Sequence, residues 1–390
     1  MKWKFYSLAF VAGMSILTAC SSDDNNDNDG NGGNGNGNEI ENGTILKGTI
    51  TSDVTLAAGN TYKLSGEYIV EEGATLHIEE GVKIIAVYDD IADYILVKQG
   101  GKINAVGTPD KPIVMTSEKE EPGAWGGIHI CGRAHTNAEG GKGSSEIGGA
   151  VYGGNDDADN SGTLQYIRLE YTGFAFDEEH EANGISFYGV GNGTIVDHCQ
   201  AYKGSDDGFE FFGGSVNVSN LVAVSCSDDS FDWTEGWNGK GTNLVAYQEA
   251  ESTLGYDCDC LMECDNNGSN KAATPVAHPV LKNLILVGNG GSKQGIRLRA
   301  GTEVEIDNAK VCGKGQPLTV ETALTENALK NGTSKLTNIT LTSELSCKEG
   351  IYTHADFIAV TSNKVDANLS YSSFEDIKKE CSWMNGSWVK

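Results

Sequence analysis

The sequence is poor in proline, poor in basic residues and without long stretches of helical periodicity. Only 6 of its 390 residues are proline whereas 51 are glycine, a composition that suits many tight turns between short strands. The chain contains 28 Lys and Arg residues and 55 Asp and Glu residues, and the formal net charge is −27. We therefore expect no binding to nucleic acid, whose phosphates are held mainly by Lys and Arg. Polyanionic sugars are repelled as well, unless a divalent cation lies between them and the protein.

Long apolar stretches are also missing, apart from one at the start of the chain. Lys2 and Lys4 precede the apolar residues 8–17, which are too few for a permanent membrane helix of about 20 residues. A short positive head before a short apolar stretch is typical of a secretion signal. Residues 21–38 contain only Ser, Asp, Asn and Gly. Because such a segment cannot bury apolar surface, we predict a flexible tether.

The junction between signal and tether resembles known export signals. Residues 17–20, Leu-Thr-Ala-Cys, resemble a bacterial lipobox, and the resemblance implies that residues 1–19 are removed and that Cys20 is lipidated. The acidic residues 21–27 resemble the tag by which Bacteroidetes-type lipoproteins reach the outer face of the outer membrane. We therefore expect a lipid-anchored outer-membrane protein that faces the cell exterior, with its tether at 20–43 and its folded domain at 44–390.

Nine cysteines follow Cys20, at positions 131, 199, 226, 258, 260, 264, 312, 347 and 381. An oxidising exterior favours disulfides, and an odd number leaves at least one thiol without a partner in the chain. The cluster Cys258, Cys260 and Cys264 is compatible with a soft-metal site or with a disulfide-pinned loop. We favour the loop, because structural zinc normally has four ligands at known spacings.

The middle of the chain nearly repeats itself. The segment Ser205–Phe211 recurs 22 residues later as Ser227–Trp233, and Asn220–Ala223 recurs 23 residues later as Asn243–Ala246. A fixed period of this length, built from short alternating strands and turn residues, is typical of a solenoid. A β-sandwich would instead show hairpin turns every 8–12 residues or so. We therefore predict an all-β protein, a parallel β-helix whose coils stack about 4.8 Å apart.

The alternation along the repeated strands assigns their faces. Two rows are predicted to point inward: Ile185, Phe209, Phe231 and Ile296, and then Phe187, Phe211, Trp233 and Leu298. One row is predicted to point outward: Ser186, Glu210, Asp232 and Arg297. A further row, His198, Asn220 and Asn243, falls at one turn, where stacked amides can hydrogen-bond one another.

The regions around the repeats are less regular. Residues 54–84 are predicted to form an N-terminal cap with the first coils, and residues 318–329 a short helix or turn insertion. Residues 132–163 and 250–280 are predicted to be loop insertions. The aromatic segment 381–388 is expected to cover the last coil, because a solenoid must hide its exposed edge.

Several segments resemble the pectin-lyase-like β-helix lipoproteins of Bacteroidetes-type cell surfaces. They are "GAWGGIHICGRA", "DNSGTLQYIRLEYTG", "SDDGFEFFGGSVN" and "SFDWTEGW". The resemblance covers roughly residues 44–390 and implies a right-handed parallel β-helix. It implies no single activity, because this fold carries lyases, hydrolases and adhesins.

Two enzyme families of this fold have motifs that can be compared with this chain. Residues 196–199, Val-Asp-His-Cys, resemble a pectate-lyase motif, but no Arg or Lys arrangement accompanies them as a base. Residues 204–207, Gly-Ser-Asp-Asp, resemble the paired aspartates of polygalacturonases. That family has Gly-His-Gly about one coil later, where this chain has residues 227–229, Ser-Asp-Asp, and its Arg-x-Lys motif is echoed only loosely at 297–299. Neither activity is carried over.

Acidic residues concentrate in residues 156–265, and the repeat stacks them. Asp206 is predicted to lie one coil from Asp228, Asp207 one coil from Asp229, and Glu210 one coil from Asp232. Carboxylates about 5 Å apart repel one another unless something compensates their charge. One answer is a calcium ion held by the turn aspartates Asp206, Asp207, Asp228 and Asp229, with help from the acidic loop 156–160. A second is a glycosidase pair, Glu210 and Asp232. A third is that the aspartates only cap turns and remain solvated.

Three functions follow from these features. The leading hypothesis is a non-catalytic surface protein that binds a glycan or another nutrient for a partner transporter of the outer membrane. We expect Glu210, Asp232, Trp237 and Arg297 to contact the ligand, with calcium at the aspartates. The alternatives are a polysaccharide hydrolase or lyase, and an adhesin or structural surface protein.

Overall fold

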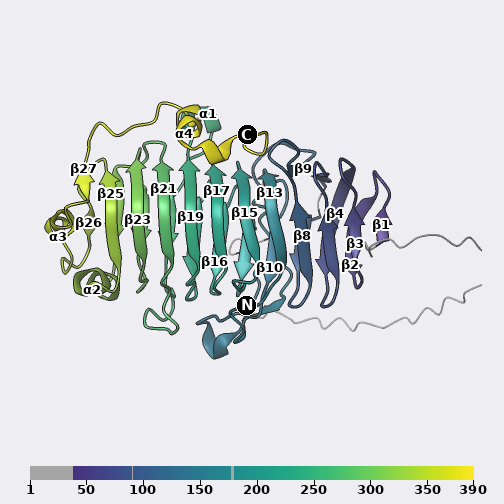
Figure 1. Cartoon of the computed structure of the whole chain (residues 1–390), viewed down its shortest axis with the longest axis horizontal. Coiled ribbons are helices and arrows are strands. Elements are labelled where there is room, and N and C mark those ends of the chain that lie inside the picture. The colour runs from purple at the N-terminus through teal and green to yellow at the C-terminus, as the bar shows by residue number, and fades with distance from the viewer. Residues whose placement is uncertain (1–37, 90, 177–179) are drawn as a thin grey trace, which may run out of the picture. The chain divides into compact units, whose positions relative to one another are not determined.

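The computed structural model describes residues 38–390 except 90 and 177–179, and these residues form one stack of parallel strands (Figure 1). Two ladders make up part of the wall in the N-terminal coils. The first contains β1 (Asn38–Ile40), β3 (Val54–Leu56), β5 (Thr75–Ile78) and β8 (Lys102–Val106). The second contains β2 (Ile45–Ile50), β4 (Thr61–Val70), β6 (Lys83–Ala86) and β9 (Ile113–Ser117).

The two N-terminal ladders merge into a single ladder of longer strands, which we call the bent ladder. Its first strand pairs with β8 through its first half and with β9 through its second half. The strands of the bent ladder are β13 (Gly162–Glu170), β15 (Ile195–Tyr202), β17 (Asn217–Val224), β19 (Lys240–Tyr247), β21 (Val280–Val287), β23 (Glu305–Cys312), β25 (Lys335–Leu341) and β27 (Lys364–Val365).

A third ladder, which we call the short-strand ladder, continues from the second half of β4. Its strands are β7 (Tyr94–Val97), β10 (Ile128–Cys131), β14 (Ile185–Tyr188), β16 (Phe209–Phe212), β18 (Phe231–Thr234), β20 (Met262–Cys264), β22 (Gln294–Leu298), β24 (Gln316–Val320) and β26 (Ser346–Cys347). All of these pairings are parallel, so the predicted parallel β-helix is confirmed.

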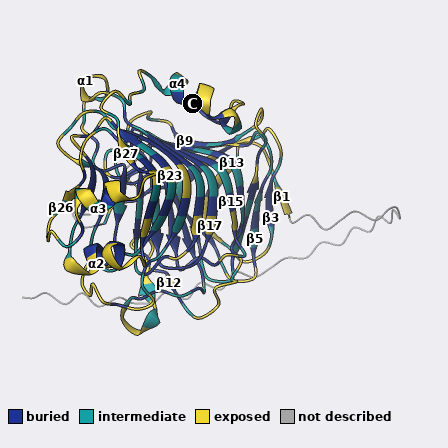
Figure 2. Ribbon diagram, turned by 60° about the vertical axis from the view of Figure 1, so that its left-hand side comes forward, coloured by how far each residue is buried: buried dark blue, intermediate teal, exposed yellow. Residues whose placement is uncertain are grey.

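The predicted inward rows lie in the core. Phe187 stacks on Phe211 with ring centroids 5.0 Å apart, and Phe209 stacks on Phe231 at 5.6 Å. The register places Ile185 opposite Phe209 and Phe211 opposite Trp233. Strand walls of buried and half-buried residues enclose this interior, while the exposed residues gather in turns and loops (Figure 2).

The predicted turn row is a ladder of side-chain hydrogen bonds that extends beyond the repeats. Asn243 donates to Asn220 at 2.8 Å, Asn283 donates to Asn243 at 3.0 Å, and Asn308 donates to Asn283 at 2.9 Å. Each of these four residues has a φ between 55° and 64°, a left-handed conformation that Asn tolerates better than most residues. The row therefore makes the corner of each bent strand.

The cap at the C-terminal end differs from the prediction. The last coils are covered by α2 (Ala323–Asn331) and α3 (His354–Ala359), whose Phe357 is fully buried with Tyr352 in the main core. The aromatic C-terminal segment instead runs back along the outside of the coils to the middle of the stack (Figure 1). The expectation that residues 381–388 cover the last coil is therefore wrong.

The returning segment consists of residues 366–390, with α4 (Phe374–Glu380) and a 3-10 turn at Ser382–Met384, and we call it the C-terminal strap. Its Trp388 is fully buried and lies edge-on to His198, with centroids 5.2 Å apart. Strap residues share a buried apolar cluster with Val245 and Ile285 of the bent ladder. Outward positions there are apolar and need a cover, which is the physical reason for this path.

One expectation about the insertions and one about the tether also need correction. Residues 132–161 do form an irregular insertion, with a short 3-10 turn (Glu139–Gly141), β11 (Gly143–Ser144) and β12 (Val151–Tyr152). Residues 250–280, however, are more than a loop. They contain a short helix, α1 (Glu251–Leu254), and they contribute β20 as a full member of the short-strand ladder between β18 and β22. The solenoid also begins at β1, within the segment expected to be tether.

The structure forms no disulfide among the nine cysteines in its described part. The predicted disulfide-pinned loop at 258–264 is therefore not observed. Cys264 points into the core between Trp233 and Leu298 of the neighbouring coils, whereas the alternation along the strand sends Glu263 outward. Ion pairs and hydrogen bonds hold this loop instead: Lys314 donates to the Cys258 carbonyl oxygen at 2.9 Å, and Lys293 pairs with Asp259.

Candidate cation and ligand site

Three consecutive strands of the short-strand ladder carry a similar acidic pattern, with a cysteine in place of one aspartate in the third. Two residues in the turn and one outward residue on the strand recur as Asp206, Asp207 and Glu210, then Asp228, Asp229 and Asp232, then Asp259, Cys260 and Glu263. The register places Glu210 opposite Asp232 and Asp232 opposite Glu263. On the next strand the pattern changes sign, and Lys293, Gln294 and Arg297 occupy the corresponding positions.

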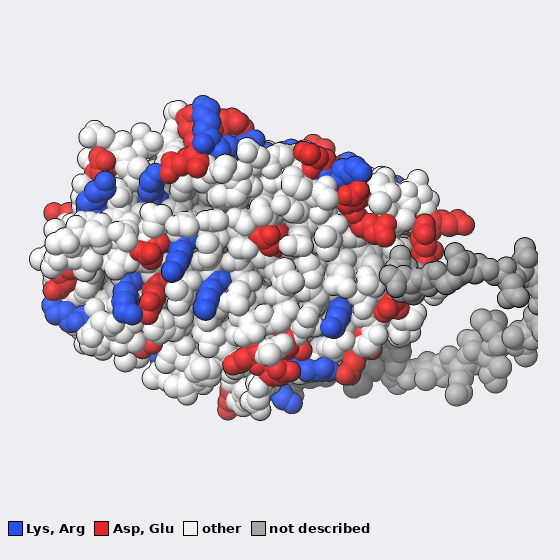
Figure 3. Space-filling view, in the orientation of Figure 1, with Lys and Arg blue, Asp and Glu red and all other residues white. Residues whose placement is uncertain are grey.

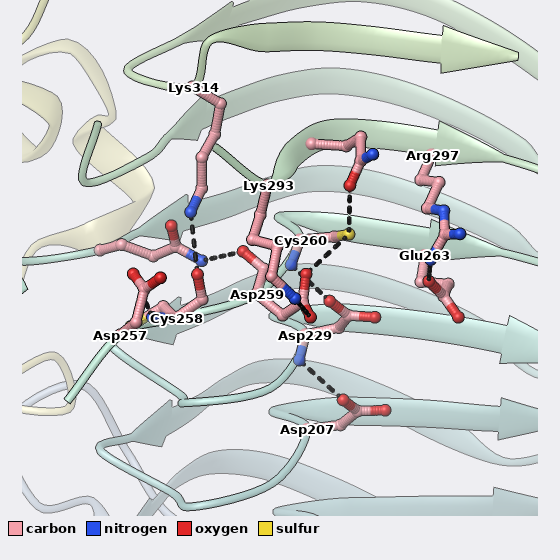
Figure 4. Close-up of polar contacts among 12 residues, drawn as sticks. Asp207, Asp229, Asp257, Cys258, Asp259, Cys260, Glu263, Lys293, Arg297 and Lys314 are labelled. Carbon is pink, nitrogen blue, oxygen red and sulfur yellow. Dashed lines mark hydrogen bonds and ion pairs between the residues drawn. The ribbon is translucent and has the colours of Figure 1, made fainter. Parts of the chain in front are cut away.

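Backbone hydrogen bonds hold the turn carboxylates in line. Asp207 Oδ1 accepts from the backbone N–H of Asp229 at 2.8 Å, and Asp229 Oδ1 accepts from the backbone N–H of Cys260 at 2.6 Å (Figure 4). Each coil therefore fixes a carboxylate of the coil before it. The exposed fractions of Asp207 and Asp229 are only 6% and 4%, so the two side chains are rigid parts of the wall rather than solvated turn residues.

The acidic side chains line an open cavity of about 410 Å³. We call it the acidic cavity, and its lining is Glu146, Glu181, Asp206, Asp207, Glu210, Asp228, Asp229, Asp232, Asp259, Glu263 and Arg297. All of these residues except Arg297 are acidic. On the face of the molecule in Figure 3, by contrast, acidic and basic side chains are interspersed.

Four sets of three side chains bring one potential ligand atom each to within 4.8 Å of the others. They are Asp206, Asp207 and Asp228; Asp207, Glu210 and Asp232; Asp229, Asp232 and Glu263; and Asp229, Asp259 and Cys260. Asp207, Asp229 and Asp232 each belong to two sets, so each could bridge two ions. Three sets contain only oxygen atoms, which are the donors that calcium prefers.

The charge of the cavity is compensated on one side only. Arg297 pairs with Glu263 at 2.8 Å, and Arg299 pairs with the same carboxylate at 2.5 Å. The six carboxylates of the first two coils, 206, 207, 210, 228, 229 and 232, form no ion pair with any residue in the described ranges. This half of the cavity therefore carries uncompensated negative charge.

The shifts in pKa follow from burial and crowding. Burial, with the neighbouring charge of Asp228, raises the pKa of Asp206 to about 8. Burial is also the largest cause that raises the pKa of Asp207, Glu210, Asp229 and Asp232 well above the ordinary range, and neighbouring carboxylates add to it. A bound cation would favour the charged forms and reverse these shifts.

One oxygen in the cavity has an unused hydrogen-bonding capacity. Asp232 Oδ1 is buried and has no hydrogen-bond partner in the described part of the chain. The neighbouring Asn183 is 1% exposed and donates to Glu210 Oε2 at 2.6 Å, while its own Oδ1 is buried without a partner. Buried oxygens without partners are costly, and a cation would satisfy them. The donor set therefore fits calcium.

The structure gathers most of the predicted site residues but not all of them. The four predicted metal ligands and the pair Glu210 and Asp232 lie together in the acidic cavity. Arg297 also lines it, although β20 separates Arg297 from Asp232. Trp237 does not: it is 1% exposed and stacks in the core on Phe211, with centroids 4.2 Å apart. The expectation that Trp237 contacts a ligand is wrong, because its ring fills the solenoid interior.

Two other predicted contributions lie elsewhere. In the loop 156–160, Asp157 pairs with His135 at 2.6 Å, and Asp159 accepts from the Arg133 backbone N–H, so neither lines the cavity. Asp197 of the pectate-lyase-like motif accepts from Ser219 and Asn220 at 2.7 Å. That motif is thus part of the asparagine corner.

Sequence reasoning missed Asp259, Glu263, Glu146 and Glu181 as cavity residues. For the first two a signal existed, because Asp259-Cys260-Leu261-Met262-Glu263 aligns with Asp206-Asp207-Gly208-Phe209-Glu210. Because three cysteines lie in this segment, it was interpreted as a disulfide-pinned loop rather than as another coil. Glu146 comes from the insertion 132–161 and Glu181 from the chain just before β14, so only the folded chain places them over the cavity.

The comparison with family models agrees with this architecture. The model of the pectate-lyase-like β-helix domain matches residues 48–390. This chain belongs to the pectate-lyase-like β-helix family. As in the fold that gives this family its name, the strands make a right-handed parallel β-helix.

More distant comparisons add little. No curated protein matches the sequence. Among solved structures, the crystal structure of Dettilon tailspike protein (gp208) is similar with 9% identity and a TM-score of 0.31, over 76% of this chain. The similar region spans 55% of that tailspike chain. None of the helices in the described ranges has the length and apolarity that a membrane crossing requires.

Proposed function

We propose that this protein is a lipid-anchored protein of the outer-membrane surface that binds a glycan or another nutrient with the help of calcium. The observation that carries the proposal is the set of six carboxylates in the first two coils of the acidic cavity, which have no ion pair within the described residues. Crowded carboxylates in a rigid wall favour a divalent cation. The cation leaves room on its open side for hydroxyl or carboxylate oxygens of a ligand.

The binding role is favoured over catalysis by the electrostatics of the pair Glu210 and Asp232. A retaining glycosidase needs one ionised nucleophile and one protonated acid, with pKa values moved apart by different environments. Here burial and neighbouring acids raise the pKa of both groups. We therefore propose that these two residues hold the cation and ligand, and that Arg297 borders them.

The proposal includes a lipid anchor at Cys20 and a transporter of the outer membrane as partner. Cys20 and residues 21–37 of the tether lie outside the described residues, and the lipobox-like sequence supports lipidation at Cys20. A captured nutrient is then passed to a transporter of the same membrane. Cell fractionation with surface protease treatment tests this placement: we expect the wild-type protein at the cell surface and Cys20→Ser outside the membrane fraction. Wild-type protein that protease reaches only after lysis would contradict the outward orientation.

The cation is tested by thermal unfolding of the intact protein in a chelator and in calcium. We expect calcium to raise Tm, since a ligand present at 100 times its Kd stabilises the native state by about 2.7 kcal/mol. Asp232→Asn should raise Tm in chelator, because it removes a crowded buried carboxyl, and should lose most of the calcium effect. Asp110→Asn, an exposed acid away from the cavity, is the control. An unchanged calcium shift in Asp232→Asn would refute this site.

Ligand binding is tested by incubating the protein with a panel of polysaccharides, with and without calcium. Calcium-dependent affinity without products supports the binding role. New reducing ends, or unsaturated products that absorb in the ultraviolet, would contradict the binding-only role and show that the protein is an enzyme. Affinity for none of them would remove the glycan part of the proposal.

A further inference from the structure

A second polar cavity opens between the two insertions. It has a volume of about 700 Å³ and is lined by Asn137, Ala138, Glu139, Thr234, Glu235, Asn267, Gly268, Ser269 and Asn270. Its walls come from the insertion 132–161 and from residues 267–270, and its floor is the end of β18 with the following turn. We call it the amide cleft. Its size is within the range of small-molecule sites.

Side-chain amides lock the two walls together. Asn137 donates to Asn266 Oδ1 at 2.8 Å, and Asn267 donates to Asn137 Oδ1 at 3.0 Å. A backbone hydrogen bond also links this wall to the floor, because the Asn137 N–H donates to the Glu235 carbonyl oxygen at 3.0 Å. Asn137 and Asn266 are 7% and 0% exposed. The cleft is therefore held open in one shape before any ligand arrives, which lowers the entropy cost of binding.

The floor presents one positioned carboxylate. Glu235 Oε2 accepts from the Thr136 hydroxyl at 2.6 Å and from the Tyr152 hydroxyl at 2.8 Å. Its other oxygen, Oε1, accepts no hydrogen bond from any residue in the described ranges. Two hydroxyl donors thus fix the direction of the side chain and leave Oε1 as an acceptor for a ligand.

The chemistry of the lining restricts the ligand. The residues of the amide cleft include no basic and no aromatic side chain, and two of them, Glu139 and Glu235, are acidic. Phosphates, sulfates and uronates would be repelled here. An apolar ligand would leave Glu235 Oε1 without a hydrogen-bond donor. Amide, hydroxyl and carboxylate groups in one rigid cleft match the alternating donors and acceptors of a neutral sugar.

The amide cleft lies beside the acidic cavity. Asp232 lines the acidic cavity and Thr234 lines the cleft, and both point outward from β18. Side chains two residues apart on one face of a strand are roughly 7 Å apart, which is close to the length of one sugar unit. One ligand can therefore contact both places.

We propose that the amide cleft is a saccharide subsite that binds a neutral, hydroxyl-rich sugar unit through Glu235 Oε1 and the surrounding amides. This inference rests on the proposed glycan-binding function and names its ligand class. The unit in the cleft is uncharged, and the adjacent units extend over the cation in the acidic cavity.

The test measures binding of neutral hexaoses of glucose, mannose and xylose, and of oligogalacturonate, to the intact protein in calcium. We expect at least one neutral oligosaccharide to bind, and Glu235→Gln and Ser269→Ala each to weaken it, the first by at least tenfold. Glu344→Gln, an exposed acid far along the chain, is the matched control for the loss of charge. Thermal unfolding of each variant shows whether the fold and the calcium shift are retained.

The outcomes separate this inference from the proposed function. Neutral-sugar binding that Glu235→Gln leaves unchanged would overturn the subsite while leaving the acidic cavity intact. Binding of oligogalacturonate alone would also overturn it, and would support a calcium-bridged acidic glycan. Loss of neutral-sugar binding in Glu235→Gln, with the calcium shift retained, supports it. If no saccharide binds to the wild-type protein, the subsite and the glycan part of the proposed function both fail.

Discussion

At the scale of single residues, the position of a carboxyl in the coil decides its chemistry. Asp207 and Asp229 would be ordinary turn residues in an isolated peptide. In the solenoid each accepts a backbone N–H from the following coil and loses nearly all contact with water. Burial and neighbouring acids then raise the pKa of both. The same residue types on the exposed surface pair with lysines instead, as Asp356 does with Lys330.

Asp93 provides a test of such burial away from the acidic cavity. It is 1% exposed, its Oδ1 accepts the Gly66 N–H, and its Oδ2 has no partner in the described part of the chain. Burial is the largest cause that raises the pKa of Asp93 to about 7, and the charges of Asp89 and Glu118 raise it further. The folded state therefore binds this proton more tightly than the unfolded state, whose pKa is near 4.

The contribution of Asp93 to stability must fall as pH rises from about 4 to about 7, because only the unfolded state ionises freely in that window. One pKa unit corresponds to about 1.4 kcal/mol, so the loss reaches roughly 4 kcal/mol. Asp93→Asn keeps the acceptor for Gly66 and has no charge. We expect it to be more stable than wild type at pH 8 and not at pH 4, by urea unfolding. An equal difference at both pH values would contradict the shifted pKa.

At the scale of elements, neighbouring coils stabilise one another through side-chain contacts. The asparagine corner links coils through side-chain amides, and the inward rings stack on one another. The outward face of the bent ladder is different, because its apolar residues, such as Val222 and Val245, find no cover within the coils. The C-terminal strap covers them, and Lys390 secures its end through an ion pair with Glu170 at 3.0 Å.

The strap leads to a prediction about Trp388. Its ring is fully buried against His198 and Tyr166. Removing a buried Trp side chain typically costs about 3–5 kcal/mol, and here the loss should appear first as opening of the strap. We expect Trp388→Ala to expose residues 366–390 to protease before the coils unfold. Tyr88→Ala, at a ring that is 53% exposed, is the control. Simultaneous cleavage of strap and coils would show that the strap is not a separate unit.

At the scale of the whole molecule, the excess of acid over base disfavours the folded state. The formal net charge is −27, and the acidic cavity concentrates part of it. Salt screens exposed charges with a Debye length of about 10 Å at 0.1 M. In a chelator, we therefore expect Tm to rise as NaCl is increased. Calcium should raise Tm at much lower concentration, because it acts inside the cavity. A calcium effect no larger than that of NaCl at equal ionic strength would mean screening alone.

Much of the architecture followed from local patterns. The period of about two dozen residues and the alternation along strands predicted the coils, the two inward rows, the outward row with Glu210 and Asp232, and the turn row with Asn220 and Asn243. These features depend only on which residues occur at equivalent places in successive coils, so a single chain carries the information. The stacking of Asp206 on Asp228 follows from the same register.

Contacts between residues that share no repeat could be seen only in the folded chain. The parallel β-helix and the acidic face of its middle coils could be predicted from the order of residues alone, because strand alternation and coil spacing are local and periodic. The position of Trp237 in the core, the path of Trp388 over the outer wall and the meeting of Asn137 with Asn266 came from packing across long separations. No spacing encodes such packing, since any apolar or amide surface of matching shape can satisfy the same side chain.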